Sequence, residues 1–180
     1  MTNSKNSRRE AGTKSSGFCA QSGSNIFGGR YSILSAYLST GEIESLITRA
    51  PNMAWEVGQG TGYAKARLDN EPMFAALIET TRQYLVPDDD GDGVFDAYLL
   101  RYPNRSYLPP HRDLASLFGR RYKRFDALVQ APDAGGVLRF GRAEVPLQVG
   151  DAVIFYPDEI EQSVSLVVGE RLVFSLGAWL

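Results

Sequence analysis

Apolar and polar residues alternate along this chain with two different periods. In the first half the spacing is helical. Ser39 and Glu42 are spaced as a capping box, and Ile43, Leu46 and Ile47 follow on one helical face. This pattern predicts a helix that begins just after Ser39 and buries that apolar face.

A second helix is predicted from about Glu71 to Leu85. Asn70 can cap it, and Pro72 falls in its first turn, where a missing N–H has no helical partner to lose. The apolar stripe of this helix comprises Met73, Phe74, Leu77, Ile78 and Leu85. An apolar segment, 31–38, precedes the first helix.

After residue 90 the pattern changes to short β-rich runs separated by glycine-containing turns. Such strands after two helices favour a β-sandwich or jelly roll with the helices packed on one side. No helical pattern separates the runs, which disfavours a parallel α/β sheet. We therefore predict a mostly β fold with flanking helices (α+β). The predicted strands are 95–102, 107–113, 125–130, 137–140, 144–147, 152–156, 162–168 and 171–180.

The composition fits one soluble domain. The chain has 180 residues, of which 43% are apolar and 22% charged. Residues 1–25 are polar and rich in glycine and serine, so we expect a flexible tail there and a single domain over 26–180. No apolar run approaches the roughly 20 residues that span a bilayer, and none has the length a signal peptide needs.

Charge, cysteine and histidine content exclude several classes of function. A formal charge of −2 provides no basic surface, so we expect neither a nucleic-acid nor a membrane partner. The single cysteine, Cys19, excludes an internal disulfide framework and a cysteine-based zinc site, and it favours a cytoplasmic location. The single histidine, His111, excludes a zinc site of two or three histidines.

His111 and Asp113 are the first candidates for chemistry. Residues i and i+2 of a strand point to the same face, so their imidazole and carboxylate would project together. With a third ligand and open positions, this pair is what a non-haem Fe(II) oxygenase requires. The spacing alone is a weak signal, and a surface pair or a satisfied polar contact is the alternative interpretation.

Ordered sequence blocks around this pair make the signal more specific. Over residues 31–180 they resemble the prolyl 4-hydroxylase-like branch of the iron- and 2-oxoglutarate-dependent oxygenases. The resemblance implies a double-stranded β-helix, that is, a cupin-like jelly roll. The blocks are Leu100-Arg101-Tyr102, Tyr107-Leu108-Pro109-Pro110-His111-Arg112-Asp113, Gly135-Gly136-Val137-Leu138-Arg139-Phe140, Val149-Gly150-Asp151-Ala152-Val153-Ile154-Phe155, Gln162-Ser163-Val164 and Val168-Gly169-Glu170-Arg171.

The resemblance also implies roles for matching residues. His111 and Asp113 would be metal ligands, and Arg171 would bind the distal carboxylate of 2-oxoglutarate through its planar guanidinium. Tyr102 would line the cosubstrate pocket, and Ser175, which faces inward on the same strand face as Arg171, would be a third cofactor-binding residue. A surface position for Arg171 and a purely packing role for Tyr102 are the alternatives.

The implied activity is an Fe(II)/2-oxoglutarate-dependent dioxygenase. It would hydroxylate or otherwise oxidise a C–H bond of a small molecule or a peptide side chain, with Fe(II) as cofactor and 2-oxoglutarate as cosubstrate. Two other functions stay open. One is a non-catalytic or iron-deficient relative that binds a small acid at Arg171, and the other is a cupin-like isomerase or hydrolase that uses His111 as a base.

Gln162 is the point where the resemblance fails, because the third metal ligand of the family is a histidine. Three hypotheses are open. Gln162 could bind the metal through its amide oxygen, or a carboxylate of Asp158, Glu159 or Glu161 could be the third ligand. In the third hypothesis the site holds no metal. Strand alternation points Glu161 away from the site unless a bulge intervenes.

Two charged segments have simpler interpretations. The acidic run 88–93 lacks the glutamate of a calcium loop, so we expect a solvated turn. The basic run 119–124 is expected to be a solvated loop near the mouth of the barrel, where it could also steer an anionic substrate.

Overall fold

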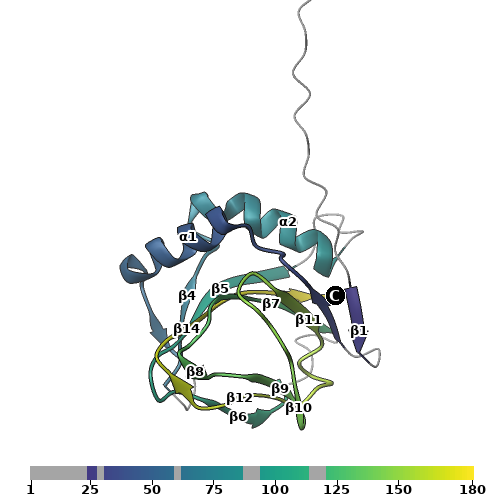
Figure 1. The fold of residues 1–180 in the computed structure, drawn as a ribbon. Helices are drawn as coiled ribbons and strands as arrows, with labels where there is room; N and C mark the ends of the chain where they lie inside the picture. The colour runs from purple at the N-terminus through teal and green to yellow at the C-terminus, as the bar shows by residue number, and fades with distance from the viewer. Residues whose placement is uncertain (1–23, 28–30, 59–61, 87–93, 114–120) are drawn as a thin grey trace, which may run out of the picture.

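The computed structural model describes residues 24–27, 31–58, 62–86, 94–113 and 121–180. Two sheets face each other, and two helices cover the outer face of the larger sheet (Figure 1). The predicted fold class, mostly β with flanking helices, is confirmed. The described chain begins with a strand at Ser24, two residues before the predicted domain boundary. Otherwise the predicted tail, like the acidic run 88–93, lies outside the described residues.

The larger sheet has eight strands, and neighbouring described strands pair antiparallel. Strand β14 lies inside this sheet, between β7 and β5. In spatial order the strands are β1 (Ser24–Phe27), β2 (Tyr31–Leu34), β11 (Ala152–Phe155), β7 (Tyr122–Gln130), β14 (Arg171–Trp179), β5 (Val94–Tyr102), β4 (Ala64–Arg67) and β3 (Glu56–Val57).

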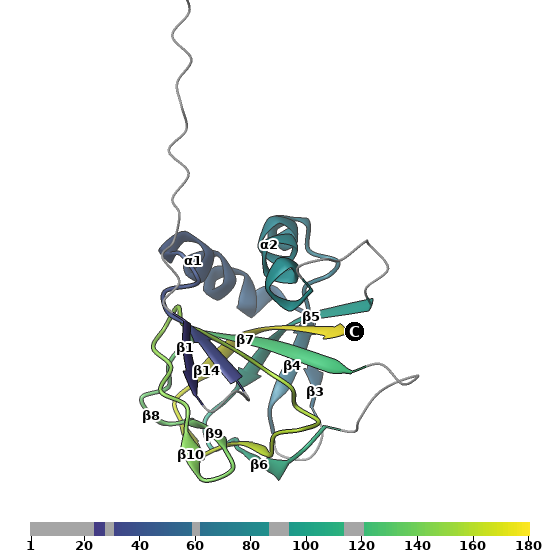
Figure 2. The same ribbon diagram turned by 90° about the vertical axis from the view of Figure 1, so that its right-hand side faces the viewer.

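The smaller sheet closes the other side of the barrel, as the view turned by 90° also shows (Figure 2). A further pair of short strands lies beside it. The four strands of the smaller sheet are, in order, β10 (Ala143–Glu144), β9 (Leu138–Phe140), β12 (Gln162–Val164) and β6 (Leu108–His111), and the further pair is β13 (Val167–Val168) with β8 (Ala134–Gly135).

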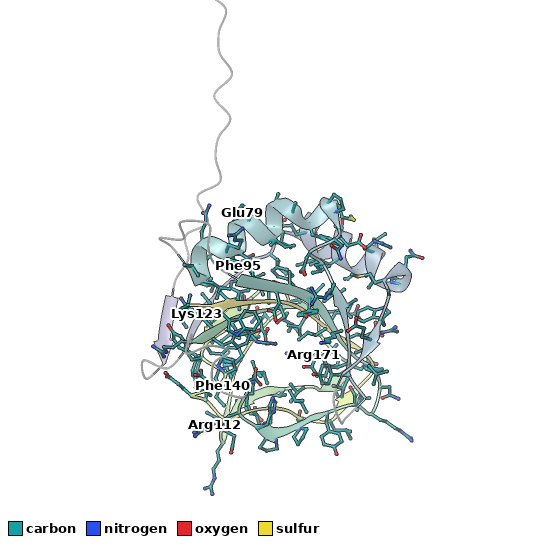
Figure 3. All side chains as sticks on the ribbon, turned by 180° about the vertical axis from the view of Figure 1, so that it is seen from behind. Glu79, Phe95, Arg112, Lys123, Phe140 and Arg171 are labelled. Atoms are coloured by element: carbon teal, nitrogen blue, oxygen red, sulfur yellow. The ribbon has the colours of Figure 1, made fainter. Side chains whose placement is uncertain are left out.

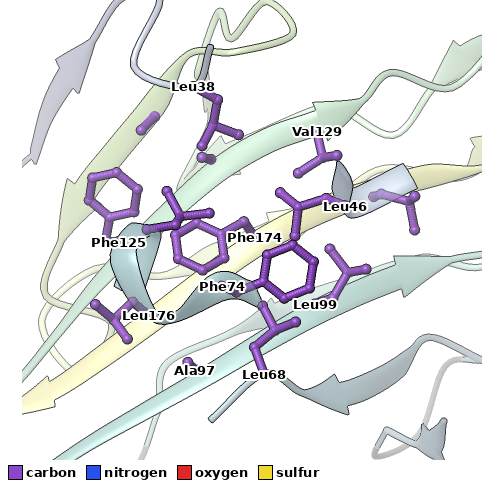
Figure 4. Close-up of a cluster of buried hydrophobic side chains, with 14 of the residues drawn as sticks. Leu38, Leu46, Leu68, Phe74, Ala97, Leu99, Phe125, Val129, Phe174 and Leu176 are labelled. Carbon is purple, nitrogen blue, oxygen red and sulfur yellow. The ribbon is translucent and has the colours of Figure 1, made fainter. Parts of the chain in front are cut away.

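The larger sheet is buried on both faces, which explains why β14 is almost continuously apolar. Leu172, Phe174 and Leu176 face the helices, in the cluster drawn in Figure 4. Val173 belongs to a second apolar cluster between the two sheets, together with Leu138 of β9. Arg171 and Ser175 lie on the same strand face as Val173, so strand alternation turns them toward the interior of the barrel.

The helices differ slightly from the prediction. Helix α1 spans Thr40–Arg49 and begins with the predicted capping box, in which the Ser39 N–H donates to Glu42 at 2.7 Å. A short 3₁₀ turn, η1 (Ala50–Asn52), follows it. The second predicted helix is instead a 3₁₀ turn, η2 (Pro72–Phe74), followed by α2 (Ala75–Leu85). No helix of the described residues has the length and apolar character needed to cross a membrane.

Several strands also differ. Strands β1, β3, β4 and β8 were not predicted. Strand β4 has the sequence Ala-Lys-Ala-Arg, whose alanines and charged residues give only a weak β signal. The segment 31–38 contributes strand β2 and then turns before α1. The predicted strand 162–168 is two strands, β12 and β13, which pair with different partners. The predicted strand 107–113 ends at His111, so Asp113 lies beyond it.

Candidate metal and keto-acid site

A cavity of about 200 Å³ lies between the two sheets. Both sheets contribute to its wall: His111 and Gln162 come from the smaller sheet, and Tyr102 and Arg171 from the larger. Figure 3 shows Arg171 directed toward the space between the sheets, whereas Arg112 projects away from the molecule. The cavity therefore collects most of the residues that the sequence singles out.

The three predicted metal ligands meet on one wall of this cavity. Gln162 lies opposite His111 in the register of β12 and β6. The His111 Nε2 atom is 3.4 Å from Asp113 Oδ1, and Gln162 Nε2 donates to the same oxygen at 3.1 Å. Asp113 is held after the strand by its N–H, which donates to the Pro157 carbonyl at 2.9 Å.

His111 has the tautomer that a metal ligand needs. Its Nδ1 atom lies 2.8 Å from the Pro109 carbonyl oxygen. Because a carbonyl only accepts, Nδ1 carries a hydrogen, so Nε2, which faces Asp113, is the ring nitrogen available to a metal. A backbone carbonyl that fixes the ring in this way is a common outer support of metal-binding histidines.

The donors on this wall fit a metal only if Gln162 takes part. Among the described residues no cluster of three or more histidine, cysteine, aspartate or glutamate side chains could hold an ion. Glu161 is exposed, and Glu159 forms an ion pair with Arg121, so neither replaces the missing histidine. Half a turn of the Gln162 amide would present its oxygen in place of its nitrogen. His111, Asp113 and Gln162 then form a set of one imidazole, one carboxylate and one neutral oxygen.

Arg171 and Tyr102 form the opposite part of the site. Each is 4% exposed, so Arg171 is not a surface arginine. The guanidinium carbon lies 5.1 Å from the centre of the Tyr102 ring, and Tyr63 stacks on that ring at 5.4 Å. Burial raises the pKa of Tyr102 to about 12, although the charge of Arg171 opposes this shift. Burial also lowers the pKa of Arg171, against the favourable effects of Tyr102 and Asp126.

Ser175 differs from the expectation. It faces the interior and is 1% exposed, but it is not among the residues that line the cavity. Its hydroxyl accepts a long hydrogen bond from Arg124 at 3.4 Å and also contacts Asp126. A serine is too short to reach past these two larger side chains, so a ligand in the cavity would meet them first.

Arg124 and Asp126 are the site residues that the sequence interpretation missed. Arg124 belongs to β7 and lines the cavity, so the expected solvated loop is wrong at this position. Its Nη2 atom lies 3.9 Å from Asp113 and donates to the Tyr122 hydroxyl at 2.5 Å. The sequence signal that could have found them is their i, i+2 spacing next to an apolar run, which places both side chains on one face of a strand.

Asp126 carries a carboxylate in a poorly solvated position. Burial raises its pKa, while the charge of Arg124 and the hydrogen bond with Ser175 oppose the shift. Its Oδ1 atom is buried and has no hydrogen-bond partner among the described residues. Uncompensated atoms of this kind are rare in proteins and tend to occur where function requires them.

Asp96 has a partner on β7. It accepts a hydrogen bond from the Tyr122 hydroxyl at 3.1 Å. Gly177 lies between the two residues on β14, and a Cβ atom there would overlap both Tyr122 and Asp96. Burial, the largest cause, and the nearby Asp96 together raise the pKa of Tyr122, so its hydroxyl stays protonated as the donor.

Comparison with solved structures shows the fold. The viral collagen prolyl hydroxylase vCPH of Paramecium bursaria chlorella virus-1, solved with 2-oxoglutarate, has 17% sequence identity to this chain and a TM-score of 0.64. The match covers 84% of this chain and 95% of the viral enzyme. A prolyl 4-hydroxylase from Pseudomonas putida matches at 17% identity and a TM-score of 0.65, over 83% of this chain and 91% of that one.

HygX from Streptomyces hygroscopicus, solved with nickel and 2-oxoglutarate, matches at 15% identity and a TM-score of 0.65, over 83% of this chain and 82% of that chain. No protein-family model and no curated protein matches the sequence. The chain therefore has the double-stranded β-helix fold of the 2-oxoglutarate/Fe(II) oxygenases, at low sequence identity.

Proposed function

We propose that this protein is an Fe(II)/2-oxoglutarate-dependent dioxygenase that oxidises a C–H bond of a small molecule or an amino-acid side chain. One observation carries the proposal: His111, Asp113 and Gln162 meet on one wall of a cavity that also contains the buried Arg171. The shared fold with oxygenases supports it. The third ligand would be the neutral amide oxygen of Gln162.

The charges that line the cavity favour a metal and a dicarboxylate bound together. Equal numbers of cations and anions face it, so their formal charges cancel when all are ionised. A dianionic keto acid alone would leave the cavity negative, whereas a divalent cation beside it restores neutrality. The charged lining residues are Lys65, Arg124, Arg171, Asp96, Asp113 and Asp126.

The metal and the keto acid together would supply the activation of dioxygen. The chain's own residues position and protect the reactants. Arg171 would bind the distal carboxylate, with the Tyr102 ring packed against its guanidinium. The Pro109 carbonyl orients the imidazole of His111. Apolar side chains exclude water from the remaining wall, namely Leu100, Leu108, Leu138 and Val164.

The direct test is conversion of 2-oxoglutarate to succinate by the purified protein with Fe(II). We expect turnover, and we expect Gln162→His to raise Fe(II) affinity by roughly tenfold or more, because imidazole is a stronger donor than an amide oxygen. The exposed Gln148→His is the matched control. Absence of turnover together with absence of Fe(II) binding under anaerobic conditions would refute the proposal. Unchanged affinity in Gln162→His would remove Gln162 from the ligand set.

One observation favours a second candidate, an iron-free protein that binds a small acid. Asp113 already has partners within the protein, because Gln162 donates to one oxygen and Arg124 lies near the other. Calorimetry of 2-oxoglutarate with and without Fe(II) separates the two candidates. Affinity that does not depend on the metal would favour the iron-free protein. For either candidate we also propose a cytoplasmic location, where the single cysteine would stay reduced.

A further inference from the structure

The cavity contains a second arginine that the keto-acid site does not use. Arg124 is held by two neutral hydroxyls, those of Tyr122 at 2.5 Å and Ser175 at 3.4 Å. Its Nε atom is buried without a hydrogen-bond partner among the described residues. Its side chain is 21% exposed, and it lines the cavity. The guanidinium is therefore positioned by the protein. Its Nε–H is buried, so the donors left for a ligand are the second N–H groups of Nη1 and Nη2.

Arg124 lacks the close carboxylate that several other described arginines have. Arg49 and Arg139 each bind a glutamate at 2.7 Å. The carboxylate oxygen of Asp113 is 3.9 Å from Arg124, beyond hydrogen-bond distance. In the proposed function Asp113 would be engaged by the metal. Asp126 then acts on Arg124 through its charge, but no hydrogen bond or ion pair joins these two side chains among the described residues. A guanidinium in that position favours an oxyanion from the ligand.

The position of Arg124 differs from that of Arg171. Arg124 lies opposite Gly177 in the register of β7 and β14, whereas Arg171 is the first residue of β14. Six strand residues separate these two levels, or about 20 Å of backbone. Arg171 contacts Tyr102, and Arg124 lies beside Asp113. The two guanidinium groups thus enter the cavity from different levels of the sheet. Both act electrostatically on Tyr102 and Asp126, but it is Arg124 that lies 3.9 Å from Asp113.

We propose that Arg124 binds an anionic group of the primary substrate, so that the substrate is a small molecule with a carboxylate or phosphate close to the carbon that is oxidised. The assignment as substrate rests on the proposed function, but the anion site itself does not. The closeness of Arg124 to Asp113 would place such an anion next to the metal and away from the keto acid's distal carboxylate.

The nearby acidic groups do not prevent anion binding. Asp96 accepts a hydrogen bond from Tyr122, and Asp126 accepts one from Ser175, so part of the charge of each carboxylate is already compensated. Lys65 also lines the cavity and adds positive charge. The cavity volume of about 200 Å³ accommodates a small anion.

The test is binding of inorganic phosphate and of acetate to the full chain without added metal, measured by calorimetry. Phosphate is expected to bind, and Arg124→Gln should weaken it by roughly ten- to a hundredfold, because charge-assisted hydrogen bonds are lost. Arg124→Lys keeps the positive charge but loses the planar guanidinium that binds an oxyanion through two N–H groups. Its phosphate affinity should therefore fall less than that of Arg124→Gln. The exposed Arg142→Gln, outside the cavity, is the matched control and should leave phosphate affinity within about threefold. Arg171→Gln shows whether the anion binds instead at the keto-acid arginine. Stronger binding of phosphate or of acetate identifies which anion the substrate carries.

Three results would overturn this inference: no binding of either anion, unchanged binding in Arg124→Gln, or equal weakening in Arg171→Gln. Thermal unfolding of each variant shows whether the fold is intact, and Arg124→Lys decides the question if Arg124→Gln does not fold. In that case, loss of anion binding in a folded Arg171→Gln also counts against it. The proposed oxygenase activity can fail without affecting these measurements, because they need neither iron nor 2-oxoglutarate.

Discussion

Three aspartates line one cavity, and each has a different environment. Asp96 accepts a hydrogen bond from a tyrosine, and Asp113 accepts one from the Gln162 amide. Asp126 is the least compensated, since one of its oxygens has no partner among the described residues and burial raises its pKa. Among these three aspartates, burial of an ionised carboxylate therefore costs the most free energy at Asp126.

This cost predicts a pH-dependent effect of Asp126→Asn. Because the folded-state pKa lies above the reference value of 3.8, the folded state binds the proton more tightly than the unfolded state. The carboxyl's contribution to stability is thus lost as pH rises from 3.8 through the folded pKa. We expect Asp126→Asn to stabilise the protein at pH 7 relative to wild type and to have little effect near pH 3.

Urea unfolding at several pH values measures this difference. The exposed Asp133→Asn is the control, and it should show no comparable gain at neutral pH. If Asp126→Asn is destabilising at pH 7, the pairing of Asp126 with Arg124 and Arg171 outweighs its desolvation, contrary to our assignment.

At this scale the sequence identified part of the site. His111, Asp113, Gln162 and Arg171 stand in ordered motifs, and the structure brings all four to one cavity. Whether they hold a metal and a keto acid is still a prediction. Arg124 was not found because its strand was expected to begin at the following residue. Since strand alternation determines which residues face inward, an error of a few residues in a strand boundary removes a residue from the site.

Individual elements depend on close contacts between neighbouring strands. Strands β5, β14 and β7 lie side by side, and the interior faces of β5 and β7 carry Asp96 and Tyr122. These two side chains meet directly over Gly177, where no Cβ atom is present. The glycine is therefore part of the hydrogen-bonded network that also positions Arg124.

Gly177→Ala should separate these side chains and destabilise the protein by about 1–3 kcal/mol, the usual range for overpacking. Gly41→Ala in α1 is the matched control, because nothing lies within 4 Å of its added Cβ. There the same change should be neutral or stabilising by up to about 1 kcal/mol. Denaturant midpoints measure both, and equal stability of the two variants would contradict the described packing.

Regular elements were predicted best where the signal is local. The capping box located the start of α1, and β-rich runs between turn signals located β5, β7 and β14. Strand β4 was missed because Lys65 and Arg67 face Tyr98, and their pairing is set by contacts distant in sequence. The break between β12 and β13 likewise depends on different partner strands, which no local pattern encodes.

For the whole molecule, the cavity lies between the two sheets, whose buried clusters pack around it. Ligands that bind there contact residues from both sheets and would stabilise the folded state over the unfolded state. Because the charges that line the cavity cancel, a divalent cation and a dianionic keto acid should stabilise the folded state more when they bind together than when either binds alone.

We expect Mn²⁺, used as a redox-stable substitute for Fe(II), and 2-oxoglutarate to raise the melting temperature together by more than the sum of their separate effects. A ligand present at about a hundredfold excess over its Kd would raise the free energy of unfolding by ~2.7 kcal/mol. For a chain of this size, that raises the melting temperature by roughly 5–10 °C. Differential scanning calorimetry measures it, with Arg171→Gln as the control that should lose the joint effect. A full shift from 2-oxoglutarate alone would instead favour the iron-free alternative.

The place of β14 in the sheet also bears on how the chain is made. This strand follows both of its neighbours in the sequence yet lies between them. During synthesis, β5 and β7 leave the ribosome with their shared partner still missing, and Leu99 and Phe125 are exposed until it arrives. Assembly should therefore be late and slow, as expected for contacts distant in sequence. Nascent chains that stall before Arg171 would be natural clients of chaperones.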